Sequence, residues 1–300
     1  MRIFVSYGDE KFSTSLKRAG FMARLLGRFD KIYLYGPNDI DDVFKSRNKE
    51  ILSIKRGAGL WLWKPYILYK AILEKANDGD IVFYCDAGSF FIRSVSHIER
   101  SMDKDDIWVS EIPFMEGQFT KEDTFSILDI VDNIRMTPQI QASCICVRRT
   151  PSSIEFIKKW LDCCCNIYLL HPKNLKPGLD NKDYFISHRE DQSILSLLCK
   201  KNGIVPHQDP TLHGKYPELY TNYGFIKPIM SRTREYPVCI ILHRSPCISI
   251  KSMIKNTIIS ILPKFIGRYL LGNKTISEED INKIKEPMYV KGYCSNITPP

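Results

Sequence analysis

The segment that decides the fold is residues 79–88, GDIVFYCDAG. Its centre, residues 81–85, is apolar on both faces, which is typical of a strand buried inside a parallel sheet. Asp86, Ala87 and Gly88 follow this strand at once. Ligands of open α/β sheets bind at the carboxyl ends of strands, so these three residues are candidates for a binding site. The alternative is an ordinary Asp-Gly turn after a strand.

Toward the N-terminus, predicted strands and helices alternate. Residues 2–5 and 31–35 are predicted strands, and residues 13–26 between them carry apolar side chains at helical spacing. A further helix begins near Pro65, where a first turn tolerates proline, and ends at the NDGD turn of residues 77–80. This alternation predicts an α/β fold in which βαβ units build a mostly parallel central sheet flanked by helices.

Toward the C-terminus, the same alternation continues. We expect a strand at residues 143–147, a helix at 152–166, a loop rich in Pro, Gly and Asn at 170–183, and a helix at 188–201. A last buried strand, residues 238–242, ends at His243. We predict one domain over residues 1–249, followed by a C-terminal extension over residues 250–300.

Positive charge is concentrated near the C-terminus. The chain has 43 Lys and Arg against 34 Asp and Glu, a formal net charge of +9, which favours an anionic partner. No acid lies between Tyr236 and Ser277, and the bases there are Arg244, Lys251, Lys255, Lys264, Arg268 and Lys274. Apolar residues interleave with these bases without an unbroken run of the ~20 residues that cross a bilayer. We expect a helical basic amphipathic extension, either on an anionic membrane surface or packed on the domain.

Composition and cysteine spacing exclude several classes of protein. The chain is 44% hydrophobic and 26% charged, which supplies a core and excludes a disordered chain. Among its 10 cysteines, residues 163–165 are consecutive, and no secretory leader opens the sequence. We therefore expect reduced thiols and a cytoplasmic location. No Cys-x-x-Cys pair begins a zinc site, so we interpret the cysteines as packing residues.

Two motifs carry a family resemblance. RGAGLWLWKPY at residues 56–66 and GDIVFYCDAG at residues 79–88 resemble bacterial surface-polysaccharide glycosyltransferases of the GT-A fold, over most of residues 1–245. The resemblance implies a GT-A-like, Rossmann-like catalytic domain. It also implies transfer of a hexose from a nucleotide-diphosphate sugar, most simply a UDP-sugar, to a lipid-linked, lipopolysaccharide or capsular glycan. Such an acceptor lies at the inner face of the cytoplasmic membrane, where the basic extension would hold the enzyme peripherally.

The resemblance assigns the turn after the buried strand to the donor. In GT-A enzymes an Asp-x-Asp motif binds a divalent cation and the diphosphate, and Asp86 corresponds to its first position. Asp86, Ala87 and Gly88 are thus the expected donor-binding residues. This chain departs from the motif at Gly88, where the second carboxylate is missing. Dependence on Mn²⁺ or Mg²⁺ is therefore left open.

The segment EDQ at residues 190–192 supplies the expected catalytic residue. It resembles a family motif whose acid is the base in inverting members and orients the sugar in retaining ones. The resemblance implies one of these two roles for Asp191 and does not choose between them. Glu190 also fits a capping box with Ser187, in which the glutamate bonds back to the helix start, so we assign Glu190 to structure.

A histidine is the expected second metal ligand. Many metal-dependent GT-A enzymes place one after the last strand, which corresponds here to His243. A neutral imidazole can complete a cation site opposite Asp86 if the two strand ends are neighbours. The alternative is a polar side chain satisfied at a strand end. His213, in a predicted loop, is the competing candidate.

Basic and aromatic residues complete the expected donor site. A departing diphosphate gains negative charge, which fixed donors stabilise best where water is excluded. Lys64, just before a predicted helix, and Arg56, beside two glycines, suit this role unless both are solvated surface residues. Tyr7, after the first strand, is expected to stack on a pyrimidine base. Of Trp61 and Trp63, at alternate positions, we expect one to face the core and the other a sugar or base.

Two rival functions are weighed against this one. Net charge and abundant aromatics also suit a nucleic-acid-binding protein, but the charge is concentrated in the extension and no RNA motif, helix-turn-helix or zinc finger is present. We therefore expect no nucleic-acid partner. Gly88 in place of a carboxylate suits a catalytically degenerate GT-A-like scaffold. A dinucleotide-binding dehydrogenase is disfavoured, because no Gly-x-Gly-x-x-Gly follows the first strand.

Overall fold

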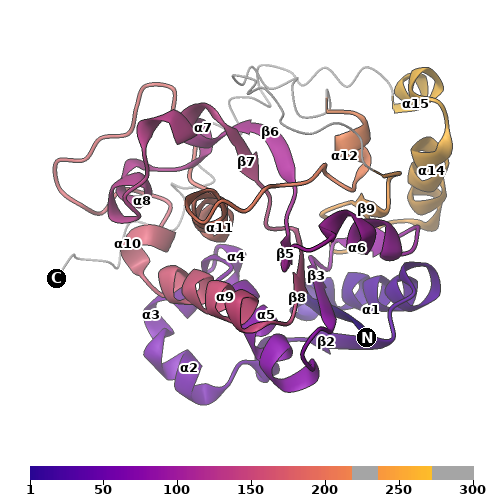
Figure 1. Cartoon of the computed structure of the whole chain (residues 1–300), viewed down its shortest axis with the longest axis horizontal. Helices are drawn as coiled ribbons and strands as arrows, with labels where there is room; N and C mark the ends of the chain where they lie inside the picture. The colour runs from indigo at the N-terminus through magenta and orange to yellow at the C-terminus, as the bar shows by residue number, and fades with distance from the viewer. Residues whose placement is uncertain (218–235, 272–300) are drawn as a thin grey trace.

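The computed structural model describes residues 1–217 and 236–271 (Figure 1). A five-stranded sheet in the order β2-β1-β3-β8-β5 lies at its centre. Its strands are β1 (Arg2–Tyr7), β2 (Lys31–Tyr35), β3 (Ile81–Cys85), β5 (Ile107–Trp108) and β8 (Cys144–Arg148). β1 pairs in parallel with β2 and β3, whereas β8 runs antiparallel to β3 and β5. Every strand of this sheet except β8 thus points the same way, and the predicted α/β class with a mostly parallel sheet is confirmed.

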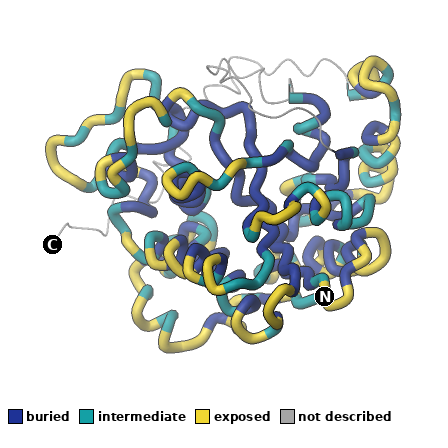
Figure 2. Tube along the Cα trace, in the orientation of Figure 1, coloured by how far each residue is buried: buried dark blue, intermediate teal, exposed yellow. Residues whose placement is uncertain are grey.

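Alternate side chains of the central strands enter two separate cores. Val82 and Tyr84 of β3 belong to one core, and Phe83 and Cys85 to the other. Every residue of β3 is buried, because the strand lies in mid-sheet with packed elements on both faces (Figure 2). A strand buried on both faces needs apolar side chains at both alternations, which explains the continuous apolar run.

Helices cover both faces of the sheet. One face carries α5 (Trp63–Lys75), α9 (Pro151–Cys164) and α11 (Glu190–Lys201), and the other carries α1 (Ser13–Met22), η2 (Ala23–Gly27) and α6 (Ser96–Met102). The predicted apolar stripe of α5 is fully buried and includes Leu68 and Ile72. α9 begins with Pro151 after Thr150, whose hydroxyl accepts a hydrogen bond from the Ser153 amide at 3.2 Å. Such a cap satisfies one of the free amides of a first helical turn.

Two small sheets lie outside the central one. β4 (Ser89–Phe91) pairs antiparallel with β9 (Ile240–Leu242), and β6 (Glu111–Met115) pairs antiparallel with β7 (Pro138–Ile140). The last predicted strand is therefore present, although its partner is β4 and not the central sheet. Beyond it, the amides of His243 and Arg244 both donate to the carbonyl oxygen of Gly88, at 2.8 and 3.0 Å. This pairing brings the end of β9 against the turn that follows β3.

Short helical turns make up most of the connections. They are η1 (Glu10–Phe12), η3 (Pro37–Asp39), α2 (Asp42–Arg47), α3 (Lys49–Leu52), α4 (Gly57–Leu60), α7 (Glu116–Phe119), α8 (Glu122–Ile127), η4 (Asp132–Met136), α10 (Ile167–Leu170) and α12 (Leu212–Lys215). The predicted loop at residues 170–183 contains no helix or strand after Leu170. His213, predicted in a loop, lies in α12.

The described part of the C-terminal extension is a pair of helices, α14 (Ile250–Ile261) and α15 (Lys264–Leu271). Ile259 of α14 is buried in a small core that also contains Tyr216. The outward apolar residues are Ile250, Ile254, Ile258, Ile261, Phe265 and Tyr269. Lys274 and the rest of the predicted extension lie outside the described residues. Over residues 1–217 and 236–271, no helix combines the length and the apolar character that a membrane span requires.

The cysteines pack as single thiols. All those in the described part of the chain are free, including the consecutive residues 163–165. Cys144 and Cys146 of β8 are buried in the core on one face of the sheet. Burial raises the pKa of Cys146 above its ordinary value, so these side chains act as small apolar groups.

Candidate active site

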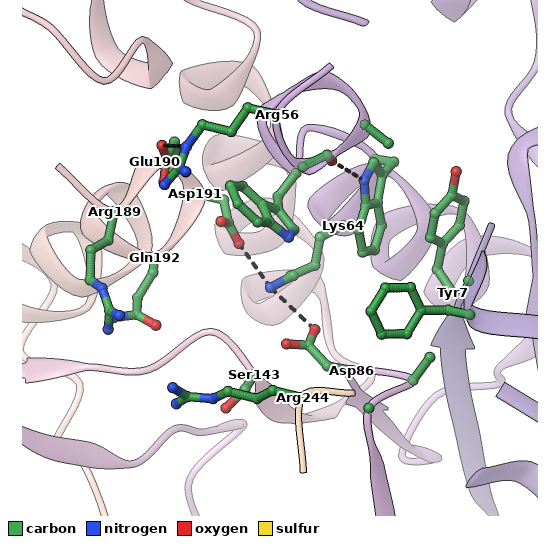
Figure 3. A pocket seen from close by; sticks show the side chains of 18 of the residues that line it. Tyr7, Arg56, Lys64, Asp86, Ser143, Arg189, Glu190, Asp191, Gln192 and Arg244 are labelled. Atoms are coloured by element: carbon green, nitrogen blue, oxygen red, sulfur yellow. Dashed lines mark hydrogen bonds and ion pairs between the residues drawn. The ribbon is translucent and has the colours of Figure 1, made fainter. Parts of the chain in front are cut away.

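A cavity of about 790 Å³ opens at the carboxyl ends of β1 and β3 (Figure 3). These two strands are hydrogen-bonded neighbours in parallel, so the turns that follow them meet at one edge of the sheet. The cavity has the size of those that hold drug-sized ligands. The predicted site residues among its lining are Tyr7, Arg56, Lys64, Asp86, Ala87, Gly88 and Asp191. Among the predicted site residues, only His243 is missing from the lining.

A buried lysine joins the two acids of the site. The Nζ atom of Lys64 lies 3.3 Å from Oδ1 of Asp86 and 3.2 Å from Oδ2 of Asp191. It also donates a hydrogen bond to the carbonyl oxygen of Ala142 at 3.2 Å. Burial alone lowers the pKa of Lys64, but the attraction of Asp191 and Asp86 outweighs burial and holds the pKa above its ordinary value. Lys64 is therefore a fixed positive charge at the end of β3.

Asp86 is the more accessible acid of the pair. Its side chain is 33% exposed, whereas that of Asp191 is 5% exposed. The hydroxyl group of Tyr84 donates to Oδ1 of Asp86 at 2.8 Å, and the Asp86 amide donates to the carbonyl oxygen of Ser143 at 2.9 Å. Burial raises the pKa of Asp191 to about 6, against the opposing attraction of Lys64. The two carboxylates thus differ in solvent access, which suits them to different tasks.

The capping-box prediction for Glu190 is wrong. α11 has Arg189 at its N-cap and no side-chain cap, and Glu190 has a φ of +40°. Its carboxylate accepts a hydrogen bond from Nε of Arg56 at 2.7 Å instead. Burial raises the pKa of Glu190 to about 7, although Arg56 opposes the rise. The partly exposed guanidinium of Arg56 offers a charge-assisted bond that is stronger than a bond to a neutral backbone amide.

A left-handed turn forms the wall of the cavity before α5. Gly57, Ala58, Gly59, Leu60 and Trp61 have φ values of 59°, 49°, 97°, 53° and 60°. A Cβ atom at Gly57 would lie 2.4 Å from the ring of Trp61, so the indole lies directly on the glycine. Non-glycine residues in this conformation store strain, which persists only where the surroundings hold it. The turn holds Trp61 half-buried at the cavity and puts the guanidinium of Arg56 over its ring, 5.3 Å from the centroid.

Trp63 lies deeper than Trp61. Its side chain is 8% exposed, and its Nε1 donates to the carbonyl oxygen of Gly57 at 2.9 Å. It stacks on Tyr7 with ring centroids 4.0 Å apart and an angle of 19°. One face of the Tyr7 ring is therefore covered by Trp63, and Tyr7 lines the cavity as part of a stacked pair (Figure 3).

His243 is not among the residues that line the cavity. The Nδ1 atom of His243 accepts a hydrogen bond from the Ser245 amide at 3.2 Å, and its ring lies 6.1 Å from that of Phe90. Burial and the charge of Arg18 lower the pKa of His243 to about 4. His213 does line the cavity, and burial, with a smaller effect of a nearby arginine, lowers its pKa to about 4.

The side chains of the cavity do not fit the expected divalent-cation site. Within the described ranges, no group of three or more His, Cys, Asp or Glu side chains could hold a metal ion. Ca²⁺, Mg²⁺ and Mn²⁺ prefer several oxygen ligands, and Asp86 and Asp191 already share the ammonium group of Lys64. Of the two metal ligands expected from the sequence, Asp86 lines the cavity and His243 does not.

Two arginines that line the cavity, Arg189 and Arg244, were not among the predicted site residues. Arg244 follows His243 at the end of β9 and has a φ of +55°. Arg189 precedes α11 and lies over the rings of Phe114 and Phe119, at 4.7 and 5.4 Å from their centroids. Both arginines are immediate neighbours of residues that the sequence did single out. A basic residue directly next to a predicted site residue is the sequence signal that could have identified them.

Comparison with known proteins gives only distant likenesses. No family model matches the chain, and no curated protein matches it. The solved structures that it resembles include glycosyltransferases from animals and bacteria. Mouse xyloside xylosyltransferase 1, in its apo form, is similar with a TM-score of 0.44 and 7% identity, over 81% of this chain and 98% of that chain.

Two further likenesses are also to enzymes of sugar transfer. The galactosyltransferase LgtC, in complex with donor and acceptor sugar analogs, is similar with a TM-score of 0.41 and 17% identity, over 82% of this chain and 88% of that chain. The glycosyltransferase GlyE of Streptococcus pneumoniae TIGR4 is similar with a TM-score of 0.44 and 13% identity, over 96% of this chain and 66% of that chain. All three TM-scores lie below 0.5, so we argue the function from this chain's own residues.

Proposed function

We propose that this chain is a glycosyltransferase that moves a hexose from a nucleotide-diphosphate sugar, with a UDP-sugar as the expected donor, to a hydroxyl group of a glycan. The observation that carries the proposal is the ion-pair bridge of Lys64 between Asp86 and Asp191. The bridge lies in a cavity of about 790 Å³ at the carboxyl ends of two parallel strands. Ligands of α/β sheets bind at this edge.

The reaction needs opposite charges side by side, and the cavity supplies them. The bond between C1 of the sugar and the β-phosphate oxygen breaks, and its electron pair stays on the phosphate. C1 then bonds to the acceptor oxygen, which loses a proton. A fixed cation such as Lys64 stabilises the departing phosphate, and a carboxylate such as Asp191 can accept the proton.

The role of Asp191 depends on the stereochemical course. In an inverting reaction Asp191 is the base, and a pKa of about 6 leaves it mostly ionised at pH 7 and close to the operating pH, as an efficient base requires. In a retaining reaction Asp191 orients the sugar, and no dedicated base is needed. NMR of the product anomer distinguishes the two courses, because a retained anomer removes Asp191 from the base role.

The proposal is tested by binding and turnover together. Calorimetric titration with UDP, GDP and dTDP identifies the nucleotide, and hydrolysis of UDP-glucose or UDP-galactose reports turnover. Asp86→Asn and Asp191→Asn are each expected to lower turnover at least ~10²-fold. The control is Asp162→Asn, because Asp162 forms an exposed pair with Lys158 on α9. Full turnover in both cavity variants, or no nucleotide binding at all, contradicts the proposal, whereas binding without turnover favours the degenerate scaffold.

We further propose that the acceptor is lipid-linked, as in lipopolysaccharide or capsule synthesis, and that α14 and α15 hold the enzyme peripherally on an anionic membrane at its cytoplasmic face. Ile254 is 55% exposed, Phe265 73% and Tyr269 85%. Exposed isoleucines recur along α14 at helical spacing, at Ile250, Ile254, Ile258 and Ile261, and so form one apolar stripe. The bases interleaved with them are Lys251, Lys255, Lys264 and Arg268. Apolar burial combined with basic charge is how interfacial helices bind anionic lipid.

Vesicle binding tests this contact. The protein is expected to sediment with vesicles that contain phosphatidylglycerol and much less with phosphatidylcholine alone. Ile254→Asp combined with Ile258→Asp is expected to lower the vesicle-bound fraction more than ~10-fold, because charge opposes burial in lipid. Val43→Asp is the control, since Val43 is a 61% exposed apolar residue on α2. Unchanged binding of the double variant contradicts the contact, as does a concentration-dependent dimer that forms through this face instead.

A further inference from the structure

The turn after β3 has no room for a second carboxylate. A Cβ atom at position 88 would lie 2.9 Å from the Cα atom of Arg244 and 3.1 Å from its backbone nitrogen. The carbonyl oxygen of Gly88 also accepts the amides of His243 and Arg244. Glycine is therefore required at position 88, because the backbone of another segment lies against it. The missing carboxylate follows from the packing of the end of β9.

Without a carboxylate at position 88, the acids near this turn are Asp86 and Asp191, and their charge is already partly neutralised. Asp86 and Asp191 share one ammonium group, that of Lys64, so this group of three side chains keeps a net negative charge when ionised. Arg56 is paired with Glu190. A diphosphate brought to Asp86 is repelled unless a further cation lies beside it. Such a cation must come from another part of the cavity.

Arg244 is a cation that the fold holds against the turn after β3. It lies against Gly88, two residues from Asp86, with its amide bonded to the Gly88 carbonyl at 3.0 Å. Its φ of +55° is in the left-handed region, so the backbone at Arg244 does not continue the extended conformation of β9. Arg244 lines the cavity together with Asp86 and Ser143, and Figure 3 shows its side chain in an extended conformation. Arg244 is exposed, and within residues 1–217 and 236–271 it has no ion pair.

We propose that the guanidinium group of Arg244 binds the diphosphate of the donor and takes the place of a divalent cation in this enzyme. The proposal rests on the proposed function and deepens it. A guanidinium presents two parallel N–H groups that match two phosphate oxygens, as a lysine ammonium cannot. Gly88 and Arg244 thus act together. The absence of a side chain at Gly88 lets the backbone of Arg244 lie against it, and Arg244 supplies the positive charge.

The chemical step balances without a metal. The C1–O bond to the β-phosphate breaks and its electron pair stays on the phosphate oxygen, while C1 bonds to the acceptor oxygen. The acceptor proton passes to Asp191 in an inverting course and to the departing phosphate oxygen in a retaining one. Arg244 keeps its protons throughout and acts only by charge and hydrogen bonds on the departing diphosphate. Fixed donors of this kind act on charge that develops in the transition state.

The positive φ of Arg244 provides a clean variant. Glycine adopts that backbone conformation freely, so Arg244→Gly removes the guanidinium and keeps the contact with Gly88. We expect Arg244→Gly to retain its melting temperature and to lose roughly 10²- to 10³-fold in kcat. Binding of UDP in calorimetry is expected to weaken at least ~10-fold. Addition of guanidinium ion is expected to restore part of kcat, which a structural role does not predict.

A matched control exists elsewhere in the chain. Arg28 is also an exposed arginine with a positive φ, 59°, and it is not among the residues that line the cavity. Arg28→Gly is expected to leave kcat and UDP binding unchanged. The complementary test is metal removal, in which EDTA followed by Mn²⁺ or Mg²⁺ is expected to change wild-type kcat less than ~2-fold.

The outcomes separate this inference from the function on which it rests. Wild-type turnover that EDTA abolishes and Mn²⁺ restores overturns the role of Arg244 and leaves the glycosyltransferase in place. Arg244→Gly with wild-type kcat and UDP affinity does the same. Failure of the wild-type protein to bind UDP, GDP or dTDP, together with no hydrolysis of sugar nucleotides, is instead a failure of the proposed function.

Discussion

The ammonium nitrogen of Lys64 lies 3.2 Å from a carboxylate oxygen of Asp191, and both side chains are only 5% exposed. Lys64→Met leaves Asp191 buried without its counterion, which typically costs about 3–5 kcal/mol of stability. Urea denaturation at pH 7 measures this loss. At pH 5 the loss is expected to be smaller, because Asp191 without Lys64 has an even higher pKa and takes up a proton.

A surface pair provides the control for this loss. Lys70 pairs with Glu74 on α5, with exposed fractions of 25% and 44%. Lys70→Met is expected to cost less than ~1 kcal/mol, as surface pairs do. Equal losses for the two methionine variants at pH 7 contradict the assignment of a buried bridge.

The rate of sugar transfer is expected to depend on the ionisation of Asp191. Burial raises the pKa of Asp191 to about 6, and a base acts only in its deprotonated form. In an inverting reaction kcat therefore rises with pH through about 6 and reaches a plateau above pH 7. A pH profile of kcat at saturating donor measures this. A flat profile between pH 5 and 7 together with an inverted product excludes Asp191 as the base.

The free energy of unfolding is expected to decrease as pH rises, because of Glu190. Its pKa is about 7 in the folded chain, against 4.5 for an ordinary glutamate. Between these two values the folded state binds more protons than the unfolded state, so the free energy of unfolding decreases as pH rises from about 4.5 to 7. The decrease due to Glu190 is at most about 3 kcal/mol.

Glu190→Gln isolates this contribution, since glutamine does not titrate. The stability difference between wild type and Glu190→Gln, from denaturation curves at pH 4.5, 6 and 7.5, is expected to shift steadily in favour of the variant. The attraction of Arg56 is already included in the pKa of about 7, because Arg56 is one of the groups that set this pKa. A difference that stays constant across the three pH values contradicts the raised pKa.

The left-handed turn before α5 predicts opposite effects for two neighbouring substitutions. Gly57→Ala adds a Cβ atom 2.4 Å from the Trp61 ring at a φ of 59°, so both strain and displacement of Trp61 are expected, at about 1–3 kcal/mol. Ala58→Gly relieves a φ of 49° and is expected to be neutral or stabilising by up to ~1 kcal/mol. Thermal unfolding of both variants, with Trp fluorescence to follow the indole, measures these effects. Stabilisation by Gly57→Ala is incompatible with this turn.

The contact between Gly88 and Arg244 predicts the result of rebuilding the Asp-x-Asp motif. Gly88→Asp is expected to lower stability by about 1–3 kcal/mol and not to create Mn²⁺ binding, because its Cβ atom meets the backbone of Arg244 at 2.9 Å. Gly36→Ala is the control, since its nearest neighbouring atom is 3.5 Å away and its φ is −137°. Tight Mn²⁺ binding by Gly88→Asp, measured by calorimetry, contradicts the steric argument.

The periodicity of apolar residues in the sequence was sufficient to predict the strands and helices that form the layers of the fold. β2 and β3 have the bounds that their apolar runs predict, and the buried stripe of α5 is the one at helical spacing. Both patterns are local, since a strand buried on two faces needs apolar residues at every position and a packed helix needs them every three to four. The same reasoning put Asp86 at the end of a buried strand, because a chain that leaves a sheet edge must turn there.

The chemistry at the cavity was decided by contacts between distant segments. Lys64 is a charged residue before a helix in the sequence, and only the approach of the β3 turn and the start of α11 makes it the counterion of Asp86 and Asp191. Glu190 satisfied a capping pattern, but the guanidinium of Arg56, from another segment, is a better partner than a backbone amide.

The last strand, β9, shows most clearly what the sequence could not predict. The sequence determined that residues near 240 form a strand and that polar residues follow it, but not that the strand pairs with β4 and lies against Gly88. After that strand Arg244 has a positive φ and lines the cavity, whereas His243 is not among the lining residues. Such an angle is set by the packing of two backbones against each other, a non-local energy that no pattern of residues along the chain encodes by itself.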